Sequence, residues 1–403
     1  MKKFRILLAY LLLPLLPLNV CSCHAPGPEH YFFLNDGYNY FNYASIHAAF
    51  GPQDTCRLAV GQAILIYLFD QPLSEYKTKL QKHFSQAEQF HIPILLELDP
   101  VSFMRDAPEL WNWWDSGKPG FDPANRENVE WSDWGSDNAV RIGWLNWGSQ
   151  MRILPMINLF SPAYQTAVRE RMDSLMTWTS EWYQSLPRER KWLLGGVKIT
   201  GELAFGINNW YYPDGNKLAE QPATGDPQTG IRIDSLPNRG VGQIGYAALT
   251  YMGRKTAGEI TIEDIWAIEK EFSAFVASLA QGYGIPRERL FSHSGGWYGD
   301  LDAAIQPNTC PSWSFYWDEA IHPANYPQVA EHLPKSDAPF WGLSEWNIGS
   351  QPRVKWAEAL ENAFSIPRCR FISLFNYPTI FQRDSSGIDQ PDPEATAALL
   401  DRQ

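Results

Sequence analysis

The feature that most limits what this chain can fold into is an alternation of β-type runs with helix-period segments along its 403 residues. Such alternation is typical of a parallel sheet whose faces are covered by helices. Apolar, β-branched and aromatic residues concentrate in eight short runs, the first of them weak. These runs span residues 30–36, 63–70, 92–100, 193–200, 289–296, 312–318, 340–347 and 369–377.

The segments between the runs supply the helices. Segment 161–186 opens with Ser161 as N-cap and Pro162 at the first helical position, which predicts a helix start there. Further helices are expected at about 73–90, 260–284 and 353–366, with a short segment at 44–50 and a weaker signal around 327–332. Strand followed by helix eight times predicts an α/β fold, the (β/α)8 TIM barrel, whose active-site residues lie at the carboxyl ends of the strands.

Two long stretches interrupt this pattern, at 101–160 and 203–256. The first has no clear period and holds seven tryptophans, and the second is rich in glycine and proline. A loop of this length inside a domain is usually functional, so we interpret the first stretch as a wall of a binding groove; the alternative is a small subdomain with its own core. Since no composition break suggests a second folded domain, we expect one domain over 24–403.

The first 23 residues have the form of a targeting segment. Lys2, Lys3 and Arg5 precede an apolar run too short to span a membrane, so removal as a signal peptide is expected. The sequence ending at Cys23 resembles the lipobox of bacterial lipoproteins. That resemblance implies a lipid anchor on Cys23 and an outer-membrane lipoprotein of the cell envelope, with a periplasmic or secreted protein as the alternative.

Composition excludes some partners and favours others. A formal charge of −12 without long basic runs argues against binding nucleic acid. The chain has 18 tryptophans, and flat apolar rings suit the C–H faces of sugars as well as protein cores. Cys56, Cys310 and Cys369 allow one disulfide at most and lack metal-ligand spacing, so no metal is expected.

The last residues of the predicted strands include several acids. Hydrolysis of a glycosidic bond needs two carboxyl groups, one protonated beside the leaving oxygen and one ionised. Glu202 ends the fourth predicted strand and Glu345 ends the seventh. The full set of strand-end residues is Asp36, Asp70, Asp99, Glu202, His293, Asp318, Glu345 and Asn376.

Acids at the ends of strands four and seven, in the motifs KITGEL and GLSEWN, resemble the clan A retaining (β/α)8 glycoside hydrolases. That clan includes β-galactosidases, β-mannosidases and cellulases. The resemblance covers about residues 30–378 and implies that Glu202 is the general acid/base and Glu345 the nucleophile. It also implies a β-linked carbohydrate substrate and no cofactor. Tyr316 matches the position of an aromatic residue that hydrogen-bonds the nucleophile in the clan.

One residue departs from the clan pattern. The acid/base commonly follows an Asn that binds the sugar 2-hydroxyl, whereas Gly201 precedes Glu202 here. Asn208 or Asn209 could replace that contact. Expected sugar contacts are Asn208, Trp210, Tyr211, His293, Trp297, Tyr316, Trp346 and Asp99.

Each of these contacts has a plainer reading. The aromatic residues could pack a core, His293 could be structural, and Asp99, which precedes Pro100, could cap a turn. Asp70 and Asp99 are also rival catalytic carboxylates, and either would favour an inverting mechanism.

Other chemistries find little support, because the chain has no dinucleotide fingerprint, phosphate-binding loop or GxSxG elbow. The expected function is a glycoside hydrolase that acts on β-linked oligo- or polysaccharide with retention. The alternatives are a glycan-binding lipoprotein without activity and an inverting carbohydrate enzyme.

Overall fold

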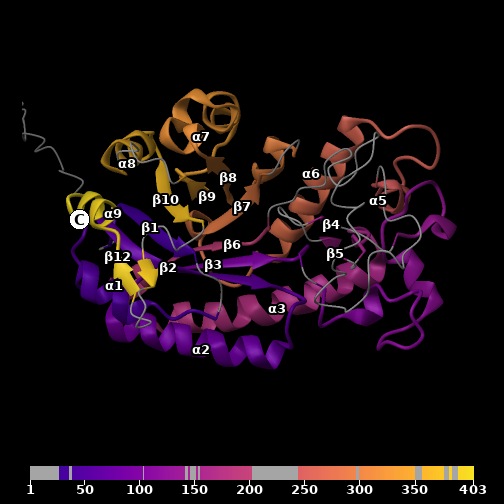
Figure 1. The fold of residues 1–403 in the computed structure, drawn as a ribbon, viewed down its shortest axis with the longest axis horizontal. Helices are drawn as coiled ribbons and strands as arrows, with labels where there is room; N and C mark the ends of the chain where they lie inside the picture. Colours follow the sequence, from indigo (N-terminus) through magenta and orange to yellow (C-terminus); the bar gives the residue numbers. More distant parts are fainter. Residues whose placement is uncertain are drawn as a thin grey trace, which may run out of the picture.

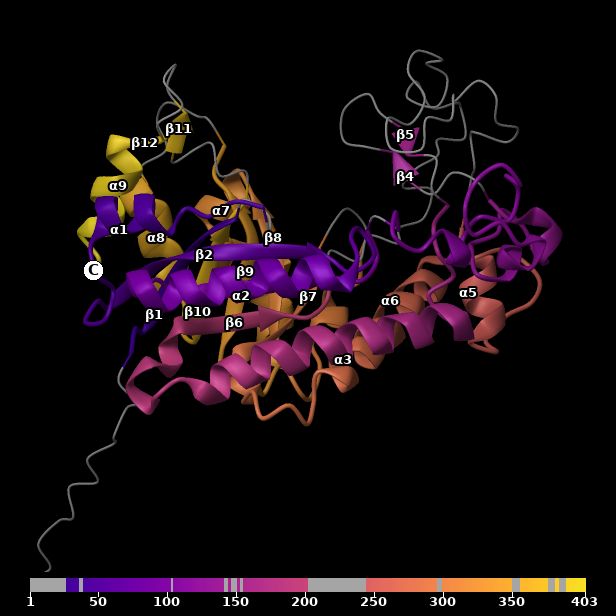
Figure 2. The same ribbon diagram turned by 90° about the horizontal axis from the view of Figure 1, so that it is seen from below.

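The computed structural model describes residues 27–35, 39–102, 104–140, 155–201, 244–295, 299–349, 356–375 and 392–403, and the backbone alone at 144–145, 151–152, 381–383 and 389–391. Eight parallel strands close into a barrel in the order β1-β10-β9-β8-β7-β6-β3-β2 (Figures 1 and 2). The strands are β1 (His30–Asn35), β2 (Leu58–Tyr67), β3 (Ile94–Asp99), β6 (Leu194–Lys198), β7 (Leu290–Ser294), β8 (Cys310–Tyr316), β9 (Trp341–Asn347) and β10 (Cys369–Leu374). The predicted (β/α)8 fold is confirmed.

Helices cover the outside of the barrel, and α2 and α3 run side by side along it (Figures 1 and 2). The main ones are α1 (Tyr43–Phe50), α2 (Leu73–Phe90), α3 (Pro162–Ser185), α6 (Ile262–Leu279), α8 (Trp356–Phe364) and α9 (Pro393–Leu400). The predicted start of α3 is confirmed, since Ser161 Oγ accepts the Tyr164 N–H at 3.2 Å. Helix α6 ends at Leu279, five residues before the end expected at 284. The weak signal at 327–332 corresponds to a π-helix at Gln328–His332.

The amino-terminal half of the barrel interior is filled by aromatic rings. Phe33, Phe291 and Phe371 point inward and are fully buried. Glycines on other strands leave room for them: a Cβ at Gly342 on the adjacent strand β9 would lie 2.3 Å from the Phe371 ring, and one at Gly195 on β6, across the barrel, would lie 2.4 Å from the Phe33 ring. The rings close this end of the barrel, so a site that binds a ligand must lie at the other end.

The first insertion packs around tryptophans. Trp111 and Trp131 are buried, and their indole N–H groups donate to the carbonyls of Met104 and Arg126. The stretch also contains the hairpin of β4 (Trp144–Leu145) and β5 (Met151–Arg152). Both rings are buried, and Trp111 belongs to the same hydrophobic core as the helices that cover the barrel. Trp113, Trp114 and Trp134 are partly exposed.

The two insertions are joined at α5 (Tyr246–Tyr251), at the end of the molecule away from α9 (Figure 1). The buried carboxylate of Glu130 accepts the N–H groups of Gly245, Ala247 and Ala248 at 2.8, 3.3 and 3.0 Å. Trp134 donates its indole N–H to Gly258 at 2.9 Å. Glu130 thus fixes the start of α5 to the tryptophan-rich stretch.

Glu130 should make stability depend on pH. Burial raises the pKa of its carboxyl to about 7 although four backbone N–H groups, the fourth that of Trp131, oppose the rise. The folded pKa lies above the unfolded one, so the protonated carboxyl stabilises the fold at low pH. The free energy of unfolding should therefore fall by roughly 3 kcal/mol as pH rises from about 4.5 to about 7. Urea unfolding of the protein and of Glu130→Gln at pH 5 and pH 8 measures this. Relative to the native protein, the free energy of unfolding of Glu130→Gln should be higher at pH 8 than at pH 5. If it changes with pH in parallel with that of the native protein, Glu130 is not the group responsible.

None of the helices among the described residues has both the length and the apolar character needed to cross a bilayer. The predicted signal peptide and Cys23 lie outside the described residues. Cys56, Cys310 and Cys369 are free thiols, so the disulfide that the sequence allowed is not formed.

Candidate active site

The carboxyl-terminal half of the barrel interior is polar, in contrast to the aromatic half below it. Seven of the eight strands, all except β2, contribute an inward polar residue here, because inward positions alternate along a strand. Buried polar groups require hydrogen-bond partners, and these side chains largely supply one another. They are Asn35, Glu97, Asp99, Lys198, His293, Ser312, Ser314, Ser344, Glu345 and Ser373.

Glu345 reaches this interior through a bulge in β9. Between the pairs Trp313↔Leu343 and Ser314↔Glu345, one step along β8 matches two along β9. The extra residue lets both Ser344 and Glu345 face inward, and Ser344 Oγ donates to Ser312 Oγ at 2.5 Å. Bulges commonly redirect a side chain beside an active site. Glu345 is therefore partly exposed at the open end of the barrel.

Tyr316, at the end of β8, donates its hydroxyl to Glu345 Oε2. This is the contact that the resemblance implied. Burial raises the pKa of the Glu345 carboxyl, and the Lys198 ammonium and the Tyr316 hydroxyl oppose the rise. Glu97 and Asp99 add to it through like charge. The carboxylate is held in one orientation, with its charge state set by several neighbours.

Two charged residues of the interior were not predicted from the sequence. Lys198 Nζ lies 2.9 Å from Glu97 Oε2, and the two side chains are 2% and 1% exposed. The available signal was a charge inside each of two apolar strands, LLGGVK and ILLELD. Charged side chains are almost never fully buried unless they are paired.

His293 does not lie where a sugar could contact it. Its ring is fully buried, with Nε2 2.9 Å from Ser314 Oγ and Nδ1 3.4 Å from Lys198 Nζ. Burial and the Lys198 charge lower the pKa of His293 well below 6.5. The predicted sugar contact is corrected: the neutral imidazole packs against Lys198 inside the barrel.

The stacking role predicted for Trp346 is wrong. Its side chain is fully buried on the outside of the barrel, and its indole N–H donates to the Ala320 carbonyl at 2.8 Å. The ring packs edge-on against Phe32 and next to Trp356. Since neighbouring residues on a strand face opposite ways, Trp346 points away from Glu345.

Asp99 lies at the end of β3 beside Gly201. Its Oδ1 accepts the N–H groups of Val101 and Ser102 at 2.8 and 2.9 Å, so the predicted turn cap is present. A Cβ at Gly201 would lie 2.4 Å from Asp99 Cγ. The Asp99 carboxyl therefore occupies the space into which a side chain at position 201 would point.

The other predicted residues divide into two groups. The rival carboxylate Asp70 forms an ion pair with Arg105, and Asp318 accepts the Tyr326 hydroxyl at 2.6 Å. Neither is engaged with Glu345. The remaining predicted site residues, Glu202, Asn208, Asn209, Trp210, Tyr211 and Trp297, lie outside the described residues.

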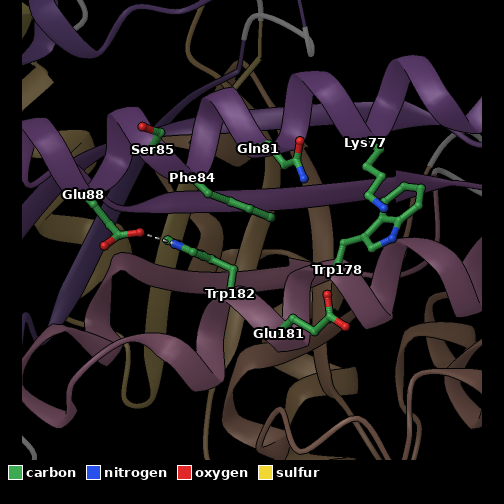
Figure 3. Close-up of a pocket in the computed structure, with 8 residues that line it drawn as sticks. All are labelled: Lys77, Gln81, Phe84, Ser85, Glu88, Trp178, Glu181 and Trp182. Carbon is green, nitrogen blue, oxygen red and sulfur yellow. Dashed lines mark hydrogen bonds between the residues drawn. The ribbon is translucent and has the colours of Figure 1, made fainter.

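A separate surface groove of about 420 Å³ lies on the outside of the barrel between α2 and α3. Figure 3 shows Phe84 stacked on Trp182, whose indole N–H donates to Glu88 at 2.9 Å. Lys77 lies 5.4 Å from the centre of a Trp178 ring. These side chains come from two helices that cover the barrel from outside, so the groove is distinct from the polar interior around Glu345.

No family model matches the chain, and no curated protein sequence matches it either. Among solved structures, 56 chains match. A GH5-4 broad-specificity endoglucanase from an uncultured bacterium is 7% identical with a TM-score of 0.41, over 89% of this chain and 82% of its own. The GH26 endo-β-1,4-mannanase of Bacillus sp. JAMB-750 is 11% identical with a TM-score of 0.43, over 93% and 85%.

The β-amylase catalytic domain of Paenibacillus polymyxa is 8% identical with a TM-score of 0.47, over 93% of this chain and 98% of that domain. The chain is thus similar at low identity to glycoside hydrolases. The order of its own strands establishes the barrel, and the roles of its residues are argued below from the site itself.

Proposed function

We propose that this chain is a glycoside hydrolase that cleaves β-linked oligo- or polysaccharide with retention. The observation that carries the proposal is Glu345, turned inward by a bulge at the end of the seventh barrel strand and bound by the Tyr316 hydroxyl. The end of a barrel strand is where catalytic groups of this fold lie. An inward carboxylate with a fixed orientation suits a nucleophile.

The proposed reaction has two displacements. Glu345 attacks the anomeric carbon while Glu202 gives its proton to the departing glycosidic oxygen, which leaves a glycosyl ester on Glu345. Glu202 then removes a proton from water, the water oxygen attacks the anomeric carbon, and the Glu345 carboxylate is released. Glu345 must be ionised before the first step. The Tyr316 hydroxyl favours that form.

The substrate class follows from the insertions and from the predicted targeting. Partly exposed Trp113, Trp114 and Trp134 belong to a stretch that we propose as one wall of an extended cleft. Such rings suit a glycan of several sugars. The predicted signal peptide and lipid anchor would place the enzyme in the cell envelope, where it could reach carbohydrate polymers that come from outside the cell.

Asp99 is proposed as a sugar contact, because its carboxyl fills the space beside Gly201. Asp99→Asn should lower kcat/KM about 10- to 150-fold, the loss expected when a charged hydrogen-bond acceptor becomes neutral. Asparagine keeps the Oδ1 that caps the turn, so the melting temperature should stay unchanged. If Asp99 acts only as a cap, Asp99→Asn will hydrolyse glycans at the native rate, and that result would remove it from the substrate site.

The proposed function is tested with purified protein on a panel of β-linked polysaccharides, with reducing ends and soluble products measured. Release of oligosaccharides that depends on Glu345 supports the proposal. Binding without products, unchanged by Glu345→Gln, would show a glycan-binding protein in place of an enzyme.

A further inference from the structure

The Lys198–Glu97 pair lies inside the barrel and is linked to the position of Glu345 through two side chains. Lys198 Nζ is 3.4 Å from His293 Nδ1, His293 Nε2 is 2.9 Å from Ser314 Oγ, and Ser314 lies opposite Glu345 in the pairing of β8 with β9. The pair has no part in the reaction as described above. The two residues face each other directly in neighbouring strands, β3 and β6. Their charged atoms are 2.9 Å apart, and both side chains are almost fully removed from solvent. Burying such a pair often stabilises a fold no better than apolar residues of similar volume would. Stability alone therefore does not explain why a buried ion pair lies at this position.

The contacts of the pair hold it rigidly. Glu97 accepts the Asn35 amide N–H through Oε2 at 3.1 Å and the Ser373 hydroxyl through Oε1 at 2.9 Å. Lys198 also lies 3.4 Å from His293 Nδ1. Because an ammonium only donates, Nδ1 must be the acceptor, which leaves the proton on Nε2 to be donated to Ser314. The ring is neutral, so Lys198 brings one positive charge into the barrel without help from His293.

The ionisable groups around Glu345 come from several strands. Among the described residues they are Lys198 on β6, Glu97 and Asp99 on β3, and Tyr316 on β8, while His293 on β7 is neutral. Lys198 is the cation of this set. Burial acts to lower the pKa of Lys198, but the charges of Glu97, Glu345 and Asp99 together raise it, so the ammonium is present at neutral pH.

We infer that Lys198 is a positioning residue for Glu345: its buried ammonium keeps the carboxylate ionised, and Glu97 fixes the ammonium in place while weakening its field. The role in catalysis rests on the proposed function, whereas the electrostatic coupling does not. An opposite charge nearby lowers a carboxyl pKa by about 1 to 3 pH units. The same charge would also stabilise the Glu345 carboxylate as it leaves the glycosyl ester in the second step.

The coupling predicts that removing Lys198 and removing Glu97 shift the titration midpoint of Glu345 in opposite directions. Lys198→Met should raise the titration midpoint of Glu345 by about 1 to 3 pH units, because the cation is lost. Glu97→Gln should lower the midpoint, because a nearby anion is lost while the cation stays. The double variant should lie between Lys198→Met and the native protein, since it removes both charges. A pair that acts only through packing would move both single variants in the same direction.

The measurement is carbon NMR of protein labelled at the side-chain carboxyl carbon of glutamate, with Glu345 assigned from the signal missing in Glu345→Gln. No substrate is needed, so the titration remains readable if the protein hydrolyses nothing. Opposite shifts support the inference. An unchanged midpoint in Lys198→Met, or shifts of one sign in both single variants, would overturn it.

The double variant also serves as a control for misfolding of the single variants. A single variant leaves one uncompensated buried charge, which destabilises the fold, whereas the double variant leaves none. If Lys198→Met does not fold, the double variant decides: a midpoint above the native value supports the inference, and a native midpoint overturns it.

In active enzyme, the acidic limb of kcat/KM should move to higher pH in Lys198→Met and stay near the native position in Lys198→Arg.

Discussion

Replacing Glu345 with glutamine should lower the hydrolysis rate by about 10⁴-fold or more, because the amide cannot form the glycosyl ester. Binding of the glycan should be kept. Glutamine has the same shape as glutamate, and its carbonyl oxygen can still accept the Tyr316 hydroxyl that Glu345 Oε2 accepts in the native site. Rates on the best polysaccharide of the panel and calorimetric titration with its oligosaccharides measure the two effects.

Glu358→Gln is the matched control for this change. Glu358 is an exposed glutamate on α8, so its substitution removes the same charge from the outer surface of the same domain. It should leave the rate unchanged. If Glu345→Gln hydrolyses glycans as fast as the native enzyme, the nucleophile has been assigned to the wrong residue.

Replacing Glu202 with alanine should lower hydrolysis of ordinary glycans by about 10²- to 10⁴-fold, the usual contribution of a general acid or base. The loss should be much smaller for aryl glycosides with an acidic leaving group, because that group needs no proton. Azide should then speed turnover, since an anion attacks the glycosyl ester without a base. The product would be a β-glycosyl azide, formed as the ester bond to Glu345 breaks.

The rescue separates a chemical role from a structural one. Native-like circular dichroism together with azide-dependent formation of glycosyl azide supports Glu202 as the acid/base. An intact fold with no rescue at any azide concentration would move that role to another carboxyl group, and Asp99 at the end of β3 would be the first to test.

Much of the barrel could be predicted because its strands are apolar on both sides, as buried parallel strands must be. The main difference is β2, which was expected from residue 63 but begins at Leu58. Gly61 and Gln62 interrupt the apolar pattern at that point. A Cβ at Gly61 would lie 2.4 Å from the Pro93 carbonyl oxygen and 2.9 Å from the Phe33 ring of the neighbouring strand, so no side chain fits there. Sequence alone does not predict that a glycine on one strand accommodates a large side chain on another, because this depends on the register of the strands.

The site shows the same limit. Alternation along a strand would have placed Trp346 opposite to Glu345, and it does lie on the outer face. The same rule would also have separated Ser344 from Glu345, and the bulge in β9 overturns it. Lys198 and Glu97 could be noticed as charges in apolar strands, but their pairing depends on the register of β3 with β6. Single-strand patterns therefore pointed to Glu345 as a candidate and did not predict the Lys198–Glu97 pair inside the barrel.

The stereochemistry of the first product tests the central proposal, a double displacement through Glu345, most directly. Proton NMR recorded within the first minutes of hydrolysis of a β-linked substrate distinguishes the two anomers before they interconvert. Retention predicts that the β-anomer accumulates first and the α-anomer follows by mutarotation. Early accumulation of the α-anomer would show a single displacement by water and would contradict the assignment of Glu345 as the nucleophile.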